Sequence, residues 1–272
     1  MKREEMLIEA EELLQKLGNK NLRIFDASVT DAQYVKGHIP GAAFFDHESF
    51  SEPEGKYDLT LLPPEVIARH IGEVGVSNDT EVVLYSWGML PYATRAWWIL
   101  YYAGHTNVRV LNCGLAAWQN AGGQLEQKVR HYPPTTFQAS FKPGMFADKE
   151  EVLEALKDSS ITVENVLPSF SYDGAHITGS SNLSCLDLMY DLDVFVPNDR
   201  LAASFQPTSQ YKRIITYCGG GIAAAFSAMA HMMVGQEDVA VYDGSLYEWI
   251  GEGLPITGTG KWEFWKIKPD KA

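Results

Sequence analysis

Cysteine is scarce in this chain: its 272 residues include only three, and no two of them stand in a Cys-x-x-Cys spacing. Cys113, Cys185 and Cys218 are odd in number and lie far apart in the sequence. This pattern argues against a disulfide framework and against a zinc or other metal site. Cys113 and Cys185 belong to no motif, so we expect both to be buried and chemically inert, as isolated free cysteines usually are.

Positive charge is scarce as well, with 22 Lys and Arg residues against 35 Asp and Glu residues and a formal net charge of −13. An acidic balance of this size argues against nucleic acid and against anionic membrane surfaces as main partners. A small anionic substrate would have to be bound by a local group of cations, because the molecule as a whole repels it.

Long hydrophobic runs are missing, and no stretch approaches the ~20 apolar residues that a membrane-spanning helix needs. The N-terminus, MKREEMLIEAEELLQKLG, has no apolar core of signal-peptide length and is too acidic for a mitochondrial transit peptide. Its apolar side chains fall on one helical face, which predicts a helix over residues 6–17 that stops at Gly18. We expect a cytoplasmic protein, without a membrane partner, in a reducing compartment.

The chain contains an internal repeat. Residues 38–42, HIPGA, have a counterpart in residues 176–180, HITGS, and residues 110–118 match residues 241–249. The copies lie roughly 130 residues apart, which is the period of a domain and not of a solenoid. Turn and extended signals without a helical period mark the segment between them as a linker. The sequence therefore predicts one domain over residues 1–126, a linker over 127–145 and a second domain over 146–272.

Each copy alternates short apolar runs with helical segments. The apolar runs cover residues 22–27, 82–86, 108–111, 161–166, 214–218 and 239–242. Strands that alternate with helices are typical of βαβ units, in which a mainly parallel sheet is covered by helices on both faces. The sequence therefore predicts two similar α/β domains in tandem.

One stretch, residues 214–226 with the sequence IITYCGGGIAAAF, places a thiol at the end of a predicted strand. Open parallel sheets bind ligands beyond the carboxyl ends of their strands, and a helix is expected to begin near Ile222. The first turn of a helix and a curled glycine loop both present unpaired N–H groups, which favour an anion such as a thiolate or a persulfide. The backbone amides expected to surround the sulfur of Cys218 belong to Gly219, Gly220, Gly221, Ile222, Ala223 and Ala224. No lysine follows the glycines, which excludes a P-loop.

Four motifs in the same order resemble the rhodanese family of tandem-domain sulfurtransferases. Residues 218–224 resemble its active loop, residues 34–46 and 92–105 resemble segments of its first domain, and residues 243–249 resemble the segment that closes its second domain. The resemblance covers nearly the whole chain. It implies two rhodanese-like domains, each an open, mainly parallel sheet with helices on both faces, of which only the C-terminal one carries the nucleophile. Ser86 stands at the equivalent position of the first domain.

The resemblance also implies a double displacement. The Cys218 thiolate takes the sulfane sulfur of a small anionic donor, forms a persulfide and passes the outer sulfur to a thiophilic acceptor such as cyanide or a thiol. No metal or organic cofactor is required. Thiosulfate is the first expected donor, with 3-mercaptopyruvate as the alternative.

The donor's anionic group has no evident partner in the sequence, because Gly219 and Gly220 supply neither a cation nor a hydroxyl group. Arg95, His38 and Trp87 are the candidate substrate-binding residues, and Arg200 is a further cation, in a predicted loop of the second domain. Tyr92, like Trp87, is an aromatic candidate for the wall of the pocket. Each candidate has a structural alternative: a salt bridge between the domains for Arg95, a turn histidine for His38 and interface core for Trp87 and Tyr92.

Two other classes of function compete with the sulfurtransferase interpretation. A cysteine phosphatase needs an arginine where this chain has Ala224, which argues against phosphoryl transfer. A non-enzymatic sulfur relay or binding module remains an alternative, although a domain that only binds partners has no need of the cysteine that this chain retains.

Overall fold

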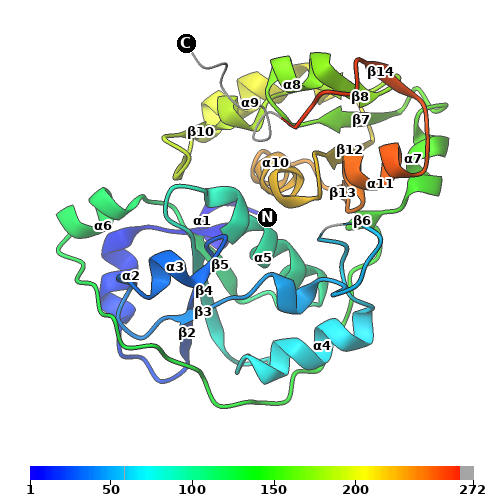
Figure 1. Cartoon of the computed structure of the whole chain (residues 1–272). Helices are drawn as coiled ribbons and strands as arrows, with labels where there is room; N and C mark the ends of the chain where they lie inside the picture. The colour runs from blue at the N-terminus through cyan, green and yellow to red at the C-terminus, as the bar shows by residue number, and fades with distance from the viewer. Residues whose placement is uncertain (58, 264–272) are drawn as a thin grey trace, which may run out of the picture.

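Each half of the chain builds a five-stranded sheet in which all neighbouring strands are parallel. The computed structural model describes residues 1–57 and 59–263 (Figure 1). The first sheet has the order β1 (Leu7–Ile8), β5 (Val108–Leu111), β4 (Glu81–Tyr85), β2 (Leu22–Asp26) and β3 (Ala43–Phe44). The second has the order β6 (Phe146–Ala147), β13 (Val239–Tyr242), β12 (Arg213–Tyr217), β7 (Ile161–Asn165) and β9 (Ser181–Asn182). The two orders are the same along the chain, which confirms two similar α/β domains.

The helices follow the same division. The first domain has α1 (Arg3–Met6), α2 (Ala10–Lys16), α3 (Asp31–Tyr34), the 3₁₀ helix η1 (Glu48–Phe50), α4 (Pro64–Glu73), α5 (Leu90–Tyr102) and α6 (Leu115–Asn120). The second has α7 (Lys149–Ala155), α8 (Ser169–Gly174), η2 (Cys185–Leu188), α9 (Asn198–Phe205), η3 (Gln206–Thr208), α10 (Ile222–Met233) and α11 (Ser245–Gly251). Two short antiparallel pairs, β8 (Ala175–Ile177) with β14 (Ile256–Gly258) and β10 (Met189–Tyr190) with β11 (Val194–Phe195), complete it.

Helices cover both faces of the first sheet, as the alternation along β4 shows. Val82 and Leu84 join the core that contains α4 and α5, whereas Val83 and Tyr85 join a second cluster that contains α2 and Trp118 of α6. Successive side chains of a strand point to opposite faces, so a strand that is apolar at every position must be covered twice.

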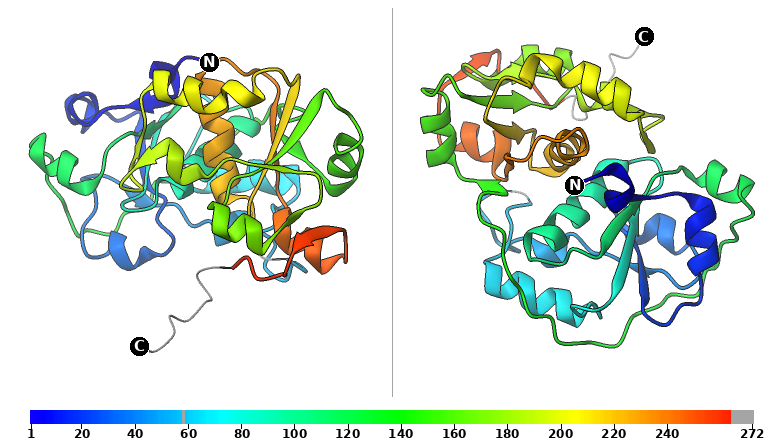
Figure 2. Two further views of the ribbon diagram at one scale, coloured as in Figure 1. Left: turned by 90° about the horizontal axis from the view of Figure 1, so that it is seen from above. Right: turned by 180° about the vertical axis from the view of Figure 1, so that it is seen from behind.

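The two domains meet along α5 and α10, the helices that follow β4 and β12 (Figures 1 and 2). Their side chains belong to one hydrophobic core that runs through both domains. Backbone bonds cross the same boundary: the amide of Leu90 donates to the carbonyl of Leu192 at 2.7 Å, and that of Leu61 donates to the carboxylate of Asp243 at 2.9 Å. These bonds hold the start of α5 and the segment after β13 at the interface.

The N-terminal segment departs from the single helix predicted over residues 6–17. It divides into α1, the strand β1 and α2, because Leu7 and Ile8 pair with Val110 and Leu111 at the edge of the sheet. Pairing there buries both side chains, which are 4% and 1% exposed, and supplies partners for the backbone. The predicted stop holds, since α2 ends before Gly18, whose φ is +83°.

The predicted linker, residues 127–145, lies along the first domain before β6 begins the second sheet (Figure 1). The amide of Thr135 donates to the carbonyl of Gly72 at 2.8 Å, and that of Ser140 donates to Ala103 at 2.9 Å. The three domain bounds remain predictions, and the last part of the second domain, residues 264–272, lies outside the described residues. Within the described part of the chain, no helix is long and apolar enough to cross a membrane.

Candidate active site

Cys218 follows β12 directly, and α10 begins four residues later at Ile222, as predicted. The residue is only 3% exposed, and its backbone is fixed on both sides. Its amide donates to the hydroxyl of Ser245 at 3.1 Å, and its carbonyl accepts from the amide of Leu246 at 3.1 Å. The start of α11 therefore holds the cysteine in place at the carboxyl end of the sheet.

Ser245 is a positioning residue whose role the sequence did not reveal. It is fully buried and has a φ of +49°, a conformation that is uncommon for residues other than glycine. Its hydroxyl accepts from Cys218 and donates to the carbonyl of Tyr242 at 2.7 Å. A left-handed serine that makes two bonds beside this cysteine is the kind of local strain that clusters at functional sites.

The loop after Cys218 contains backbone N–H groups that have no acceptor among the described residues. Residues 1–57 and 59–263 offer no acceptor for the backbone N–H groups of residues 219–224. Carbonyls in the loop are bonded, since Gly219 accepts from Tyr247 at 3.0 Å and Gly221 accepts from Ala225 at 3.2 Å. The loop therefore bonds through its oxygens and leaves its donors available at the N-terminus of a twelve-residue helix, an arrangement that binds anions.

A cavity of about 590 Å³ opens beside Cys218 at the boundary between the domains. The first domain contributes Met89, Pro91 and Tyr92 to its wall, and the second contributes Cys185 and Leu186 among others. None of the described residues that line it carries a charge. The cavity exists only because the domains meet, so the first domain supplies a wall of the site.

All three cysteines are free and buried, and Cys113 and Cys185 carry raised thiol pKa values. Burial raises the pKa of Cys185 to about 12, helped by the negative charge of a Cys218 thiolate nearby, although this thiol lines the same cavity. Burial also raises the pKa of Cys113 to about 12, with Glu9 and Asp193 adding to the effect. Since the thiolate is the nucleophile, neither thiol is suited to attack at neutral pH.

Arg95 lies at the interface and not in the wall of the cavity. Its side chain is 2% exposed, forms an ion pair with Asp243 of the second domain and stacks over the ring of Phe146 at 5.5 Å. A Cβ atom on Gly221 would lie 3.0 Å from its Nη1 atom. Arg95 therefore supports the cysteine loop from behind and matches the salt-bridge alternative for this residue.

His38 lies inside the first domain. It is fully buried, with Nδ1 2.7 Å from the carbonyl of Tyr34 and Nε2 3.2 Å from that of Lys128. His176, its counterpart in the repeat, stands 2.8 Å from the carbonyl of Tyr172, and each imidazole stacks on the ring of its tyrosine. The same turn is built twice, so His38 belongs to the turn and does not line the cavity beside Cys218.

Two further candidates also lie away from the cavity. Trp87 packs on Tyr85 with ring centroids 4.6 Å apart and joins the buried cluster on the α2 side of the first sheet. Arg200 is exposed on α9 and does not line the cavity. Tyr92, which the sequence places with Trp87 at the wall of the pocket, does line the cavity from the first domain, and Cys185, which was not predicted to bind substrate, lines it from the second.

The loop equivalent to the cysteine loop is closed in the first domain. Ser86 is 3% exposed. The amide of Gly88 donates to the carboxylate of Asp193, which the second domain inserts beside Gly114. In the first domain, the carboxylate of Asp193 thus accepts a hydrogen bond from a loop amide. In the second domain, the loop that follows Cys218 opens onto the cavity instead.

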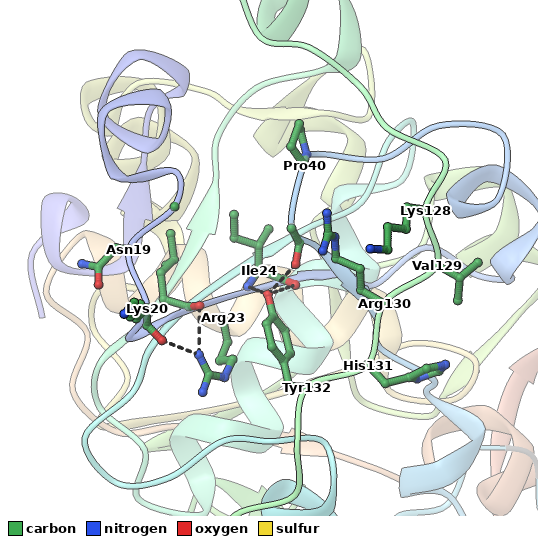
Figure 3. A pocket seen from close by; sticks show the side chains of 13 residues that line it. Asn19, Lys20, Arg23, Ile24, Pro40, Lys128, Val129, Arg130, His131 and Tyr132 are labelled. Atoms are coloured by element: carbon green, nitrogen blue, oxygen red, sulfur yellow. Dashed lines mark hydrogen bonds between the residues drawn. The ribbon is translucent and has the colours of Figure 1, made fainter.

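A second cavity, of about 430 Å³, lies on the first domain and is lined by basic side chains (Figure 3). Lys20 and Arg23 lie on one side of Tyr132, with Lys128 and Arg130 on the other. Both arginines already have partners: Arg130 pairs with Glu126, and Arg23 donates to backbone carbonyls and stacks over Tyr132. None of the described residues that line this cavity is a cysteine, so it offers no thiol to carry a sulfur.

His47 is the buried group from which we expect acid sensitivity of the first domain. Burial lowers the pKa of this imidazole to about 4, and its Nε2 atom donates to the carbonyl of Ala27 at 3.0 Å. Between about pH 6.5 and 4 the unfolded chain binds a proton that the folded chain does not, so stability is expected to fall by up to about 3 kcal/mol over this range. The His47→Gln variant should lose this part of the pH dependence in denaturant titrations at pH 7 and 4.5.

The exposed His131 provides the matched control for that experiment. His131→Gln should retain the pH dependence of the natural protein, because this variant leaves the buried His47 in place. An unchanged difference between pH 7 and 4.5 in His47→Gln would contradict the assignment to His47.

The fold and the site together define a class of protein. It has two parallel α/β domains, and one of them carries a cysteine at the end of a strand, followed by an anion-binding loop. A family model described as "Rhodanese-like domain" matches residues 9–121 and 148–252. The chain therefore belongs to the rhodanese family, with two rhodanese domains. Its relatives place it among the sulfurtransferases.

Individual relatives cover most of the chain. Thiosulfate sulfurtransferase of Bos taurus is 30% identical over 259 residues, covering 87% of both chains. 3-Mercaptopyruvate sulfurtransferase of Escherichia coli K12 is 29% identical over 261 residues, covering 88% of this chain and 93% of the relative.

Solved structures also match most of the chain. The crystal structure of the 3-mercaptopyruvate sulfurtransferase SseA from Escherichia coli has a TM-score of 0.80, with 29% identity over 88% of this chain and 98% of SseA. A persulfide form of EanB with ergothioneine has a TM-score of 0.85 at 22% identity over 95% of this chain and 71% of EanB, which shows a shared fold.

Gly221 is the glycine of the loop at which a side chain is expected to do most harm. Its φ is +80°, and a Cβ atom would lie 3.0 Å from Arg95 Nη1 and 3.2 Å from Asp243 Oδ1. Gly221→Ala should therefore displace the loop amides and lower sulfur transfer at least about tenfold. Gly235→Ala is the matched control, because its φ is +94° and nothing lies within 4 Å of the new atom. Equal losses of thiocyanate formation in both variants would contradict this prediction.

Proposed function

We propose that this sulfurtransferase moves a sulfane sulfur from thiosulfate to a thiophilic acceptor through a persulfide on Cys218. One observation carries the proposal: the buried cysteine at the start of α10 is followed by free loop amides and opens onto a cavity. Backbone donors aimed at one atom stabilise a negative sulfur before and after transfer. Cys218 and the loop amides of residues 219–224 would form the catalytic group. The protein would act in a reducing cytoplasm, without nucleic acid or a membrane as partner.

Thiosulfate and 3-mercaptopyruvate are the two candidate donors, because relatives named for each are about equally similar to the chain. Both are small anions, yet no described residue that lines the cavity is a cation. The loop amides are then the group that holds the donor's charge. Thiosulfate remains the first donor to test, although amides at a helix N-terminus suit the charged oxygens of either donor.

The test is direct observation of the persulfide. Purified protein is incubated with thiosulfate or with 3-mercaptopyruvate, desalted and weighed intact by mass spectrometry. We expect a gain of one sulfur atom that cyanide removes with release of thiocyanate, and peptide mapping should place this sulfur on Cys218. The ratio of loading rates assigns the donor. Absence of the added sulfur with both donors would contradict the proposal and favour a non-enzymatic binding module.

A further inference from the structure

The cavity beside Cys218 is larger than thiosulfate or cyanide requires. Its volume of about 590 Å³ falls within the range of about 300–1,000 Å³ that is typical of pockets for organic ligands. Cyanide contains only two atoms, so the cavity provides space for a larger acceptor next to the sulfur.

The wall of this cavity is apolar on both sides. The first domain contributes Met89, Pro91 and Tyr92, and the second contributes Leu186 and Met189. Two of these side chains face solvent, with Met89 39% and Leu186 45% exposed. Large apolar side chains that remain in water at the wall of a cavity mark a binding surface, and methionine adapts to ligands of different shape.

Charge points to the same class of ligand. Once the persulfide sulfur occupies the loop amides, a charged acceptor would lose its hydration in this cavity without meeting an opposite charge, since the described lining residues are all uncharged. Arg95, the cation behind the loop, is already paired with Asp243. We propose that the cavity binds a small-molecule thiol with an uncharged apolar body as the acceptor. This inference rests on the proposed function, because it needs the persulfide on Cys218.

The transfer step balances without any additional reactant. The acceptor thiol attacks the outer sulfur of the Cys218 persulfide, and the bond between the two enzyme sulfurs breaks. The electron pair of that bond stays on Cys218, which becomes a thiolate. The acceptor thiol becomes a persulfide, and the proton of the thiol moves to the transferred sulfur. No net oxidation or reduction occurs, since a sulfane sulfur passes from one thiol to another.

The experiment measures single-turnover discharge of the preformed Cys218 persulfide by straight-chain thiols from ethanethiol to hexanethiol. Burial of each added methylene should raise the second-order rate constant by about twofold to fourfold. 3-Mercaptopropionate, which has a carboxylate on a short chain, should react more slowly than propanethiol. Cyanide discharge in the same preparation shows that the persulfide is intact and reactive.

Variants of the wall locate the effect. Leu186→Gln and Met89→Gln should each flatten the increase of rate with chain length. Val129→Gln replaces an apolar side chain that is 52% exposed and does not line this cavity, so the increase should persist. If the persulfide forms but the rate is independent of chain length, or the carboxylate thiol reacts faster, this inference is overturned and the proposed function stands. If no persulfide forms, the proposed function fails first.

Discussion

Cys218→Ser should lower thiocyanate formation by at least about a thousandfold, because a hydroxyl group with no base in hydrogen-bond contact cannot replace a thiolate as nucleophile. The loop amides remain in this variant, but they have no sulfur anion to stabilise. The free energy of unfolding should change little, since serine is close to cysteine in size and the loop amides next to the side chain offer donors to its oxygen. The measurement is steady-state turnover with thiosulfate and cyanide, together with a denaturant titration.

Cys113→Ser supplies the matched control for the loss of a buried thiol. Cys113 is 7% exposed and packs in the cluster on the α2 side of the first sheet, away from the cavity. Its replacement should reduce stability and leave the turnover of the folded enzyme unchanged. Turnover of Cys218→Ser close to that of the natural protein would show that another group carries the sulfur.

The longer strands could be predicted from the sequence because their apolar runs are long enough to show a pattern. β5 and β13 begin and end where residues 108–111 and 239–242 predict them. The edge strands β1, β3, β6 and β9 have two residues each, too few to show any period, so the segment around β1 was assigned to a helix. Pairing with β5 decided its structure, and that pairing depends on residues about a hundred positions away.

The candidate site was predictable in the part that is local in sequence. Cys218 and its loop are adjacent residues at the end of one strand, whereas Tyr92 meets them only because α5 packs on α10. The repeat carried a signal about His38: a histidine present in both copies, of which one has no nucleophile, belongs to the fold. His176 makes the same contact in the second domain.

Replacing Arg95 by methionine is expected to cost about 3 kcal/mol or more of stability, the largest loss we expect from any single contact between the domains. The carboxylate of Asp243 is only 16% exposed and would lose Arg95, its charged partner among the described residues, while keeping the amide of Leu61 at 2.9 Å. A buried charge without its partner cannot recover its hydration, so the cost exceeds what the pair itself contributes. Denaturant titrations of Arg95→Met and of the natural protein measure it.

A control and a second variant separate this loss from other effects of removing an arginine. Arg69→Met breaks an exposed pair with Glu73, whose side chains are 63% and 51% exposed, and should change stability by no more than about 0.5 kcal/mol. Adding Asp243→Asn to Arg95→Met removes the stranded charge and should restore part of the stability. The alternative outcome is additivity, in which Asp243→Asn lowers the free energy of unfolding by the same amount in Arg95→Met as in the natural protein. The two residues would then not interact. Recovery in the double variant would establish that Arg95 and Asp243 join the first domain to the segment that holds the Cys218 loop.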